Sequence, residues 1–153
     1  MIERFEHFAL SISSLYRYMQ KIERVEMEKY NLKGPHAQCM ITMLRYPEGV
    51  TSAQLCELCD KDKAAVSRTV AELEQAGMIQ RNTNSGNRYR ARLVLTETGR
   101  EAALAVTQTA LLAVEQAGSG LTEEQRQHFY FAMDLIAQNL GRICEEGLPE
   151  RKE

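Results

Sequence analysis

The N-terminal part of the chain carries apolar residues at alternating spacings of three and four. They are Phe5, Phe8, Ile12, Leu15, Met19 and Ile22. This spacing predicts a helix with one apolar stripe, like the seam of a coiled coil, that packs in a core or against a partner in a dimer. Gly34-Pro35 predicts that this helix ends near Lys33 and that a short second helix follows, ending at Tyr46-Pro47.

The next segment has the pattern of two short helices joined by a tight turn. Thr51-Ser52-Ala53-Gln54 is a capping box, in which the Thr and Gln side chains each bond to the other residue's backbone amide. A third helix is therefore expected there, with Leu55 and Leu58 facing inward. After a brief interruption, Asp60 or Asp62 is expected to cap another helix. Such an arrangement is a helix-turn-helix.

The second of these helices has two distinct faces. Val66, Val70 and Leu73 form one apolar stripe, which attaches the helix to the core. At about 100° per residue, the outward face carries Ala64, Ser67, Arg68, Ala71 and Gln75. The alanines allow close approach, the Arg can bond to guanine O6 and N7, and the Ser and Gln can meet a base edge or a phosphate. Insertion into a DNA groove is favoured, because a merely solvated face would carry more Glu and Lys.

A hairpin is expected to follow. An extended run begins at Met78, and the cluster 82–87, rich in Asn, Ser and Gly, favours a turn. The return arm has arginine at every second place, which puts Arg88, Arg90 and Arg92 on one face of a strand. These cations can reach phosphates or a minor groove. The alternative is an ordinary edge strand protected by its charges.

The C-terminal part is expected to be helical. Thr96 caps a long Ala-rich helix through about Ala117, apolar on nearly every side and therefore expected to lie between other helices. Glycines at 118 and 120 break it, and Thr122-Glu123-Glu124-Gln125 is a second capping box. The apolar side of the last helix consists of Phe129, Ala132, Met133, Ile136, Leu140 and Ile143. The end helices have more apolar surface than the central module can cover, which favours a twofold dimer.

Composition limits the class of protein. The chain has 153 residues, which fits one compact domain or a small reading head on a helical frame. Hydrophobic residues at 44% and charged residues at 26% are typical of soluble globular proteins. The N-terminus does not have the basic-then-apolar layout of a secretory signal, and the longest apolar stretches are far shorter than the roughly 20 residues of a membrane span. A cytoplasmic location is expected.

Charge is distributed unevenly although the formal net charge is only −2. Residues 61–100 contain eight basic and four acidic residues and so carry +4. The rest of the chain, with 11 basic and 17 acidic residues, carries −6. A basic module on an acidic frame suits binding to phosphates, because this attraction depends on local cations.

Other candidate chemistry is sparse. Cys56 and Cys59 have C-x-x-C spacing, but no second pair or nearby His completes a zinc set, so both are expected to be reduced structural thiols. A sensing or metal role is the alternative. The three histidines are widely separated, and no catalytic motif occurs. We therefore expect no cofactor, no metal site and no enzymatic activity.

Two stretches are specific enough to suggest a family. One runs from Asp62-Lys63-Ala64-Ala65-Val66-Ser67-Arg68-Thr69-Val70 to Leu73-Glu74-Gln75-Ala76-Gly77-Met78-Ile79-Gln80-Arg81. The other is Asn87-Arg88 followed by Leu95-Thr96-Glu97-Thr98-Gly99. In this order, and with the helices around them, they resemble the recognition helix, the wing and the end of the wing in the MarR family of bacterial transcriptional regulators. The resemblance spans nearly the whole chain.

The resemblance implies a fold that is mainly α with a small β-hairpin wing, a winged helix-turn-helix domain with N- and C-terminal dimerisation helices. The dimerisation helices are expected over 1–33 and 121–147, the winged helix-turn-helix region over 35–95 and a long connecting helix over 96–118. The implied function is that of a homodimeric, sequence-specific repressor that binds a pseudo-palindromic operator in double-stranded DNA. Release by a small ligand is part of the same expectation.

The resemblance also implies roles for particular residues. Arg88 is implied as the wing arginine, while Ser67 and Arg68 read bases or contact phosphates. The full set of expected DNA-binding residues is Lys63, Ala64, Ser67, Arg68, Gln75, Arg88 and Arg90. Members of the family often bind a small aromatic or anionic effector between frame and reading head, and Tyr16 and Tyr30 are candidates for contacting it or are simply packing residues. A thiol- or metal-responsive regulator of the same fold, or a winged-helix scaffold that binds protein, remains the alternative.

Overall fold

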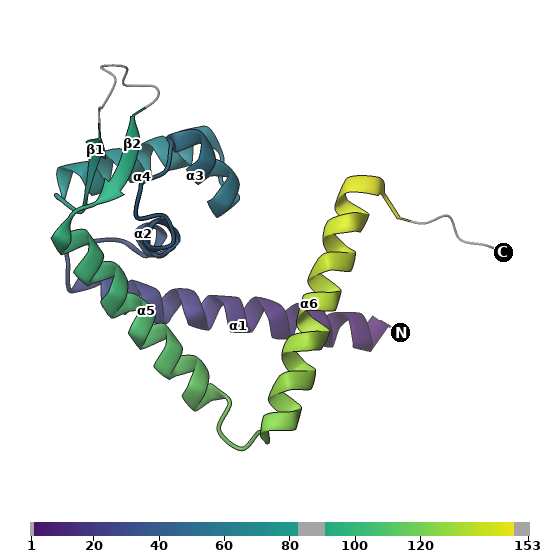
Figure 1. The fold of residues 1–153 in the computed structure, drawn as a ribbon. Helices are drawn as coiled ribbons and strands as arrows, with labels where there is room; N and C mark the ends of the chain where they lie inside the picture. Colours follow the sequence, from purple (N-terminus) through teal and green to yellow (C-terminus); the bar gives the residue numbers. More distant parts are fainter. Residues whose placement is uncertain (1, 83–90, 149–153) are drawn as a thin grey trace. The chain divides into compact units, whose positions relative to one another are not determined.

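Six helices and one two-stranded antiparallel sheet make up the described part of the chain, residues 2–82 and 91–148 of this computed structural model (Figure 1). The helices are α1 (Ile2–Glu28), α2 (Gly34–Leu44), α3 (Ser52–Cys59), α4 (Lys63–Gln75), α5 (Glu97–Ala117) and α6 (Glu123–Glu146). The strands are β1 (Ile79–Asn82) and β2 (Arg92–Leu95). The expected fold class, mainly helical with a small hairpin, is confirmed. The chain forms two compact units, Met1–Ala113 and Val114–Glu153.

Helix α2 is the centre of the first unit. It contacts α1, α3, α4 and β2, and Figure 1 shows it end-on among these elements. Its Ala37 and Met40 are completely buried. The neighbouring elements each contribute buried apolar side chains to the same core, among them Met27, Leu55, Val70, Leu73, Leu93 and Val106. Because this core includes residues of both α4 and β2, it holds α4 and the base of the hairpin together.

The base of the hairpin is a short antiparallel ladder. Ile79 pairs with Leu95, and Asn82 pairs with Arg92 at the other end of the ladder. Val50, just before α3, adds a bridge to Leu93 through reciprocal backbone bonds of 3.0 and 2.7 Å. The predicted hairpin is thus confirmed at its base, while the predicted turn and its arginines at 88 and 90 fall in 83–90, outside the described residues.

Helix boundaries follow local capping chemistry at most of the predicted places. The side chains of Thr51, Asp62 and Thr122 each accept the backbone N–H three residues further on, so these predicted N-caps are confirmed. Of the two candidates before α4, Asp62 is the cap. Asp60 instead ends α3 in a left-handed conformation, with φ of 49°. Thr96 caps α5 by accepting the Gly99 N–H at 3.0 Å.

Two predicted details were wrong. Helix α1 ends at Glu28 rather than near Lys33, because Tyr30 and Leu32 both bond back to the Met27 carbonyl and Asn31 turns the chain at φ of 55°. Leu58 does not face inward and is 42% exposed. The buried positions of α3 are Leu55 and Cys59, four residues apart, because α3 spans only about two turns and packs on one narrow side.

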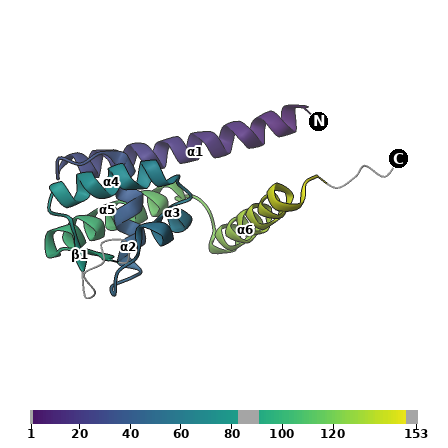
Figure 2. The same ribbon diagram turned by 90° about the horizontal axis from the view of Figure 1, so that it is seen from above.

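The end helices leave much apolar surface uncovered within one chain. Figure 2 shows α1 extending beyond the helices around α2, and Phe5, Leu10 and Leu15 along it are 71, 67 and 53% exposed. In the second unit, α6 has no buried residue. No described helix is both long enough and apolar enough to cross a lipid bilayer.

Candidate nucleic-acid interface

Helix α4 has the two faces that the sequence predicts. Val66, Val70 and Leu73 are 3, 2 and 0% exposed and anchor the helix in the core. All the residues predicted to face outward are exposed: Ala64, Ser67, Arg68, Ala71 and Gln75. The helix therefore presents a surface of small side chains around one arginine, although its contact with DNA stays a prediction.

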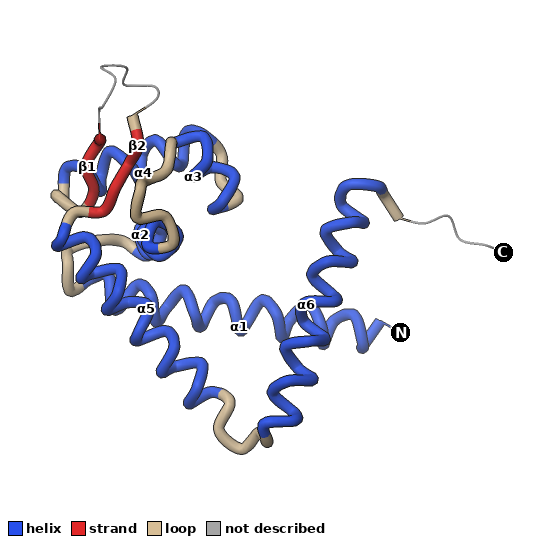
Figure 3. The backbone as a smooth tube through the Cα atoms, in the orientation of Figure 1, coloured by secondary structure: helices blue, strands red, loops and turns tan. Residues whose placement is uncertain are grey.

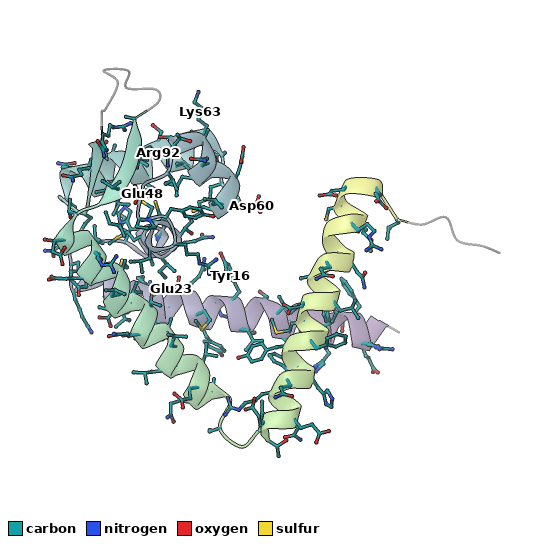
Figure 4. All side chains as sticks on the ribbon, viewed as in Figure 1. Tyr16, Glu23, Glu48, Asp60, Lys63 and Arg92 are labelled. Atoms are coloured by element: carbon teal, nitrogen blue, oxygen red, sulfur yellow. The ribbon has the colours of Figure 1, made fainter. Side chains whose placement is uncertain are left out.

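A tight turn joins α3 to α4 and places the start of α4 at the surface. Helix α3 contacts α4, and residues 60–62 join the two in a helix-turn-helix (Figure 3). Lys63 begins α4 and projects away from the unit in Figure 4. Lys63 and Arg68 form no ion pair with another described residue, so their charges are directed to solvent. A cation at the first turn and an exposed arginine further along the same helix suit a polyanionic surface.

The base of the wing is joined to α4 by an ion pair that the sequence analysis missed. Arg81 donates two hydrogen bonds to Glu74, at 2.7 and 3.0 Å, in a bidentate geometry. Arg92, expected to project together with Arg88 and Arg90, instead donates to the Gly49 carbonyl at 3.0 Å. Arg81 and Arg92, both in the basic segment, therefore form hydrogen bonds within the protein. No local spacing rule links these partners in the sequence.

A third contact joins α4 to the corner between α1 and α2. Glu72 accepts from Lys33 Nζ at 3.2 Å and lies 2.8 Å from His36 Nε2. His36 is 4% exposed, and its Nδ1 accepts the Lys33 N–H at 2.9 Å. Lys33 and then His36 lower the pKa of Glu72 below its ordinary value through these hydrogen bonds. Residues 33, 36 and 72 were not singled out from the sequence, because 36 or more positions separate the two sides of this contact.

Three of the four cysteines lie in or against the core, whereas Cys144 is exposed. Cys59 is buried and lies 3.7 Å from the Thr42 hydroxyl, while Cys56 is half-buried against the core. Burial, followed by the proximity of Cys59, raises the pKa of Cys39 to about 12, so this thiol stays protonated at neutral pH. Among the described residues, no three His, Cys, Asp or Glu side chains group in a way that could hold a metal ion.

A groove of about 830 Å³ runs between α1 and the start of α2. It is lined by Tyr16, and Figure 4 shows Tyr16 and Glu23 on the side of α1 that faces α2. The cations along it are Arg17, Lys21, Arg24, Lys33 and Lys61. Burial raises the pKa of Glu23, with Lys61 acting in the opposite direction. Tyr30, the other predicted ligand contact, is half-buried against the core and does not line the groove.

A helix-turn-helix followed by a hairpin on one core defines the class of winged helix-turn-helix proteins. Residues 30–88 match the model of the MarR family. This match confirms the resemblance that the sequence motifs indicate. Because members of this family are DNA-binding transcriptional regulators, the match also supports the expectation of a regulator rather than an enzyme.

The chain is similar to other proteins over most of its length. The chain is 22% identical over 134 residues to the uncharacterized HTH-type transcriptional regulator YybA of Bacillus subtilis (strain 168), with 88% of this chain and 89% of that protein covered. A MarR transcriptional regulator from Methanosarcina mazei Go1 has the same fold, with a TM-score of 0.79, 23% identity and coverage of 90% of this chain and 99% of that one. A MarR family transcriptional regulator from Listeria monocytogenes, solved with 26mer DNA, gives a TM-score of 0.75, 20% identity and coverage of 94 and 97%.

Proposed function

We propose that this chain is a homodimeric, sequence-specific DNA-binding repressor that reads a pseudo-palindromic operator and is released by a small ligand. The observation that carries the proposal is the exposed face of α4, where small side chains surround Arg68 while Val66, Val70 and Leu73 hold the opposite face in the core. Such a face can enter a major groove, since it brings an arginine to the base edges without bulky neighbours.

The proposed contacts divide into two groups. Arg68 donates to a guanine, Ala64 allows close approach, and Ser67 and Gln75 contact base edges or phosphates. Lys63, Arg88 and Arg90 contact phosphates or the adjacent minor groove. The roles of Arg88 and Arg90 rest on the sequence, because both lie outside the described residues. The solved Listeria relative with 26mer DNA supports double-stranded DNA as the partner of this fold.

The proposed dimer uses the helices at both ends of the chain, over 1–33 and 121–147. Both carry apolar residues that one chain leaves exposed, such as Leu15 at 53% and Phe129 at 46%. A second copy is the occupant that offers a matching stripe at the same spacing. The winged region, 35–95, and the connecting helix, 96–118, then place two copies of α4 about 34 Å apart, one turn of B-DNA.

The proposed effector site is the groove that Tyr16 lines. Its phenol ring and the surrounding cations suit a small aromatic or anionic molecule. Tyr16 is the stronger of the two predicted contacts, because Tyr30 packs against the core instead. A ligand bound there acts by favouring a conformation in which the two reading heads no longer match the spacing of the operator.

The test is binding of a fluorescent promoter fragment from the chain's own gene. We expect saturable binding that weakens steeply with salt, and a loss of at least about tenfold in affinity for Arg68→Ala and for Arg88→Ala. Arg100→Ala is the matched control, since Arg100 is an exposed cation of the same basic segment on α5. Equal affinity of all four proteins, or no binding in dilute buffer, would contradict the proposal and favour a protein-binding scaffold.

A further inference from the structure

The contact of Glu72 with the α1–α2 corner takes up both oxygens of its carboxylate. Lys33 Nζ bonds to Oε1, and His36 Nε2 bonds to Oε2. Since His36 Nδ1 accepts a backbone N–H, the neutral ring carries its hydrogen on Nε2, and this N–H donates a hydrogen bond to Glu72. The corner therefore supplies two donors to one acceptor group on α4.

Glu72 is also one helical turn away from Arg68. Residues four apart on a helix are neighbours, and a carboxylate and a guanidinium at this spacing attract each other. Glu72 and Arg68 nevertheless form no ion pair, and Glu72 bonds to Lys33 and His36 instead. Lys33 and His36 thus compete with Arg68 for the same carboxylate.

We propose that Lys33 and His36 are positioning residues for DNA reading, which hold Glu72 away from Arg68 and so leave the Arg68 guanidinium available to a base. The inference rests on the proposed function, since it gives Arg68 a partner in DNA. His36 is suited to the task because it is buried and fixed at both ring nitrogens. Lys33 adds charge, and its long side chain is 73% exposed.

A rescue experiment tests the inference. Lys33→Ala frees Oε1 of Glu72, and His36→Leu, which has no donor, frees Oε2. We therefore expect about threefold to tenfold lower affinity of each variant for the promoter fragment. Glu72→Gln removes the competing charge and is expected to bind at least as tightly as the unaltered protein. Combining Glu72→Gln with Lys33→Ala or His36→Leu should therefore restore affinity to within about twofold of Glu72→Gln alone.

The controls separate positioning from folding and from general charge. Arg100→Ala removes an exposed cation of α5 that does not touch Glu72, and it should leave affinity within about twofold. Thermal unfolding of each variant shows whether it is folded under the assay conditions. If Lys33→Ala and His36→Leu bind like the unaltered protein, or if Glu72→Gln fails to rescue them, the inference is overturned.

A second measurement does not depend on DNA. The ¹⁵N NMR signal of Arg68 Nε–H should shift and exchange more slowly in Lys33→Ala, as Glu72 turns toward Arg68, and should return to its original position in Lys33→Ala with Glu72→Gln. An unchanged Arg68 signal in Lys33→Ala overturns the inference. Failure of the unaltered protein to bind DNA would instead contradict the proposed function, and this signal would still show whether the Glu72 carboxylate changes partner.

Discussion

Glu26 places a buried carboxylate between two helices of the first unit. It is 6% exposed, lies 2.7 Å from Lys29 Nζ and accepts from the Thr109 hydroxyl of α5 at 3.0 Å. The hydrogen bond from Lys29 has the largest effect and lowers the pKa of Glu26. Burial raises this pKa, and the bond from Thr109 lowers it further. Because the folded pKa is lowered, the contribution of Glu26 to stability is present above its ordinary value of 4.5 and is lost as the pH falls through the folded value.

The first prediction concerns this carboxylate. Glu26→Gln should lower the free energy of unfolding by about 1 kcal/mol at neutral pH, because a charge-assisted bond becomes a neutral one. The difference from the unaltered protein should shrink below about pH 4.5, where the carboxylate itself takes up a proton. Urea unfolding at several pH values measures both effects. A difference that stays constant across this range would show that Glu26 does not act through its charge.

Leu55 and Leu58 show how far the spacing of apolar residues predicts the burial of single side chains. Both are apolar and both were expected inside, yet Leu55 is fully buried and Leu58 is 42% exposed. Periodicity identifies the helix, but which of two neighbouring stripes is covered depends on where the adjacent helices lie. That information belongs to tertiary packing, and a two-turn helix carries too few residues to reveal it.

At the scale of elements, the junction between wing and α5 depends on a close backbone approach. A Cβ atom at Gly99 would overlap the Met78 carbonyl oxygen, which is backbone and cannot rotate away. The Met78 carbonyl oxygen also accepts the Thr96 N–H at 2.9 Å. This bond joins the residue that follows β2 to the residue that precedes β1. Glycine is therefore required for steric reasons at the start of α5.

The second prediction follows from this junction. Gly99→Ala should lower the free energy of unfolding by about 2 kcal/mol or more, since buried overpacking against backbone has no easy relief. Gly141→Ala is the matched control, because a Cβ at Gly141 in α6 meets no atom within 4 Å. It should be neutral or stabilising by up to about 1 kcal/mol. Equal effects of the two substitutions in denaturant unfolding would refute the steric explanation.

The sequence predicted the elements better than it predicted the contacts between them. Thr51, Asp62 and Thr122 could be identified as caps because capping depends on residues three apart. The end of α1 was misplaced, since the turn at Asn31 is set by backbone bonds to Met27 rather than by a glycine. The bonds of Glu72 and Arg81 left no signal, because their partners come together only after folding.

At the scale of the whole molecule, the apolar side of α6 leads to the third prediction. Leu140, 47% exposed on that side, should be covered in the proposed dimer. Leu140→Glu should therefore shift the protein at micromolar concentration from twice its 17.4 kDa chain mass toward one chain mass in sedimentation or light scattering. Gln138→Glu adds the same charge about 200° around the helix and should leave the dimer intact. A monomeric unaltered protein, or a dimer in both variants, would contradict this arrangement.

The bond between Glu74 and Arg81 bears on how the protein responds to ionic strength. A cation already neutralised by a carboxylate displaces few counterions from DNA, so the number of arginines in the basic segment overstates the salt dependence.

The fourth prediction is that Lys63→Ala reduces the slope of log affinity against log salt by about one, whereas Arg81→Ala leaves the slope nearly unchanged even if it weakens binding. A salt titration of both variants measures the two slopes, and equal reductions would show that Arg81 contacts phosphate. The salt dependence of affinity then counts the cations that contact DNA and leaves out those that are paired within the protein, such as Arg81.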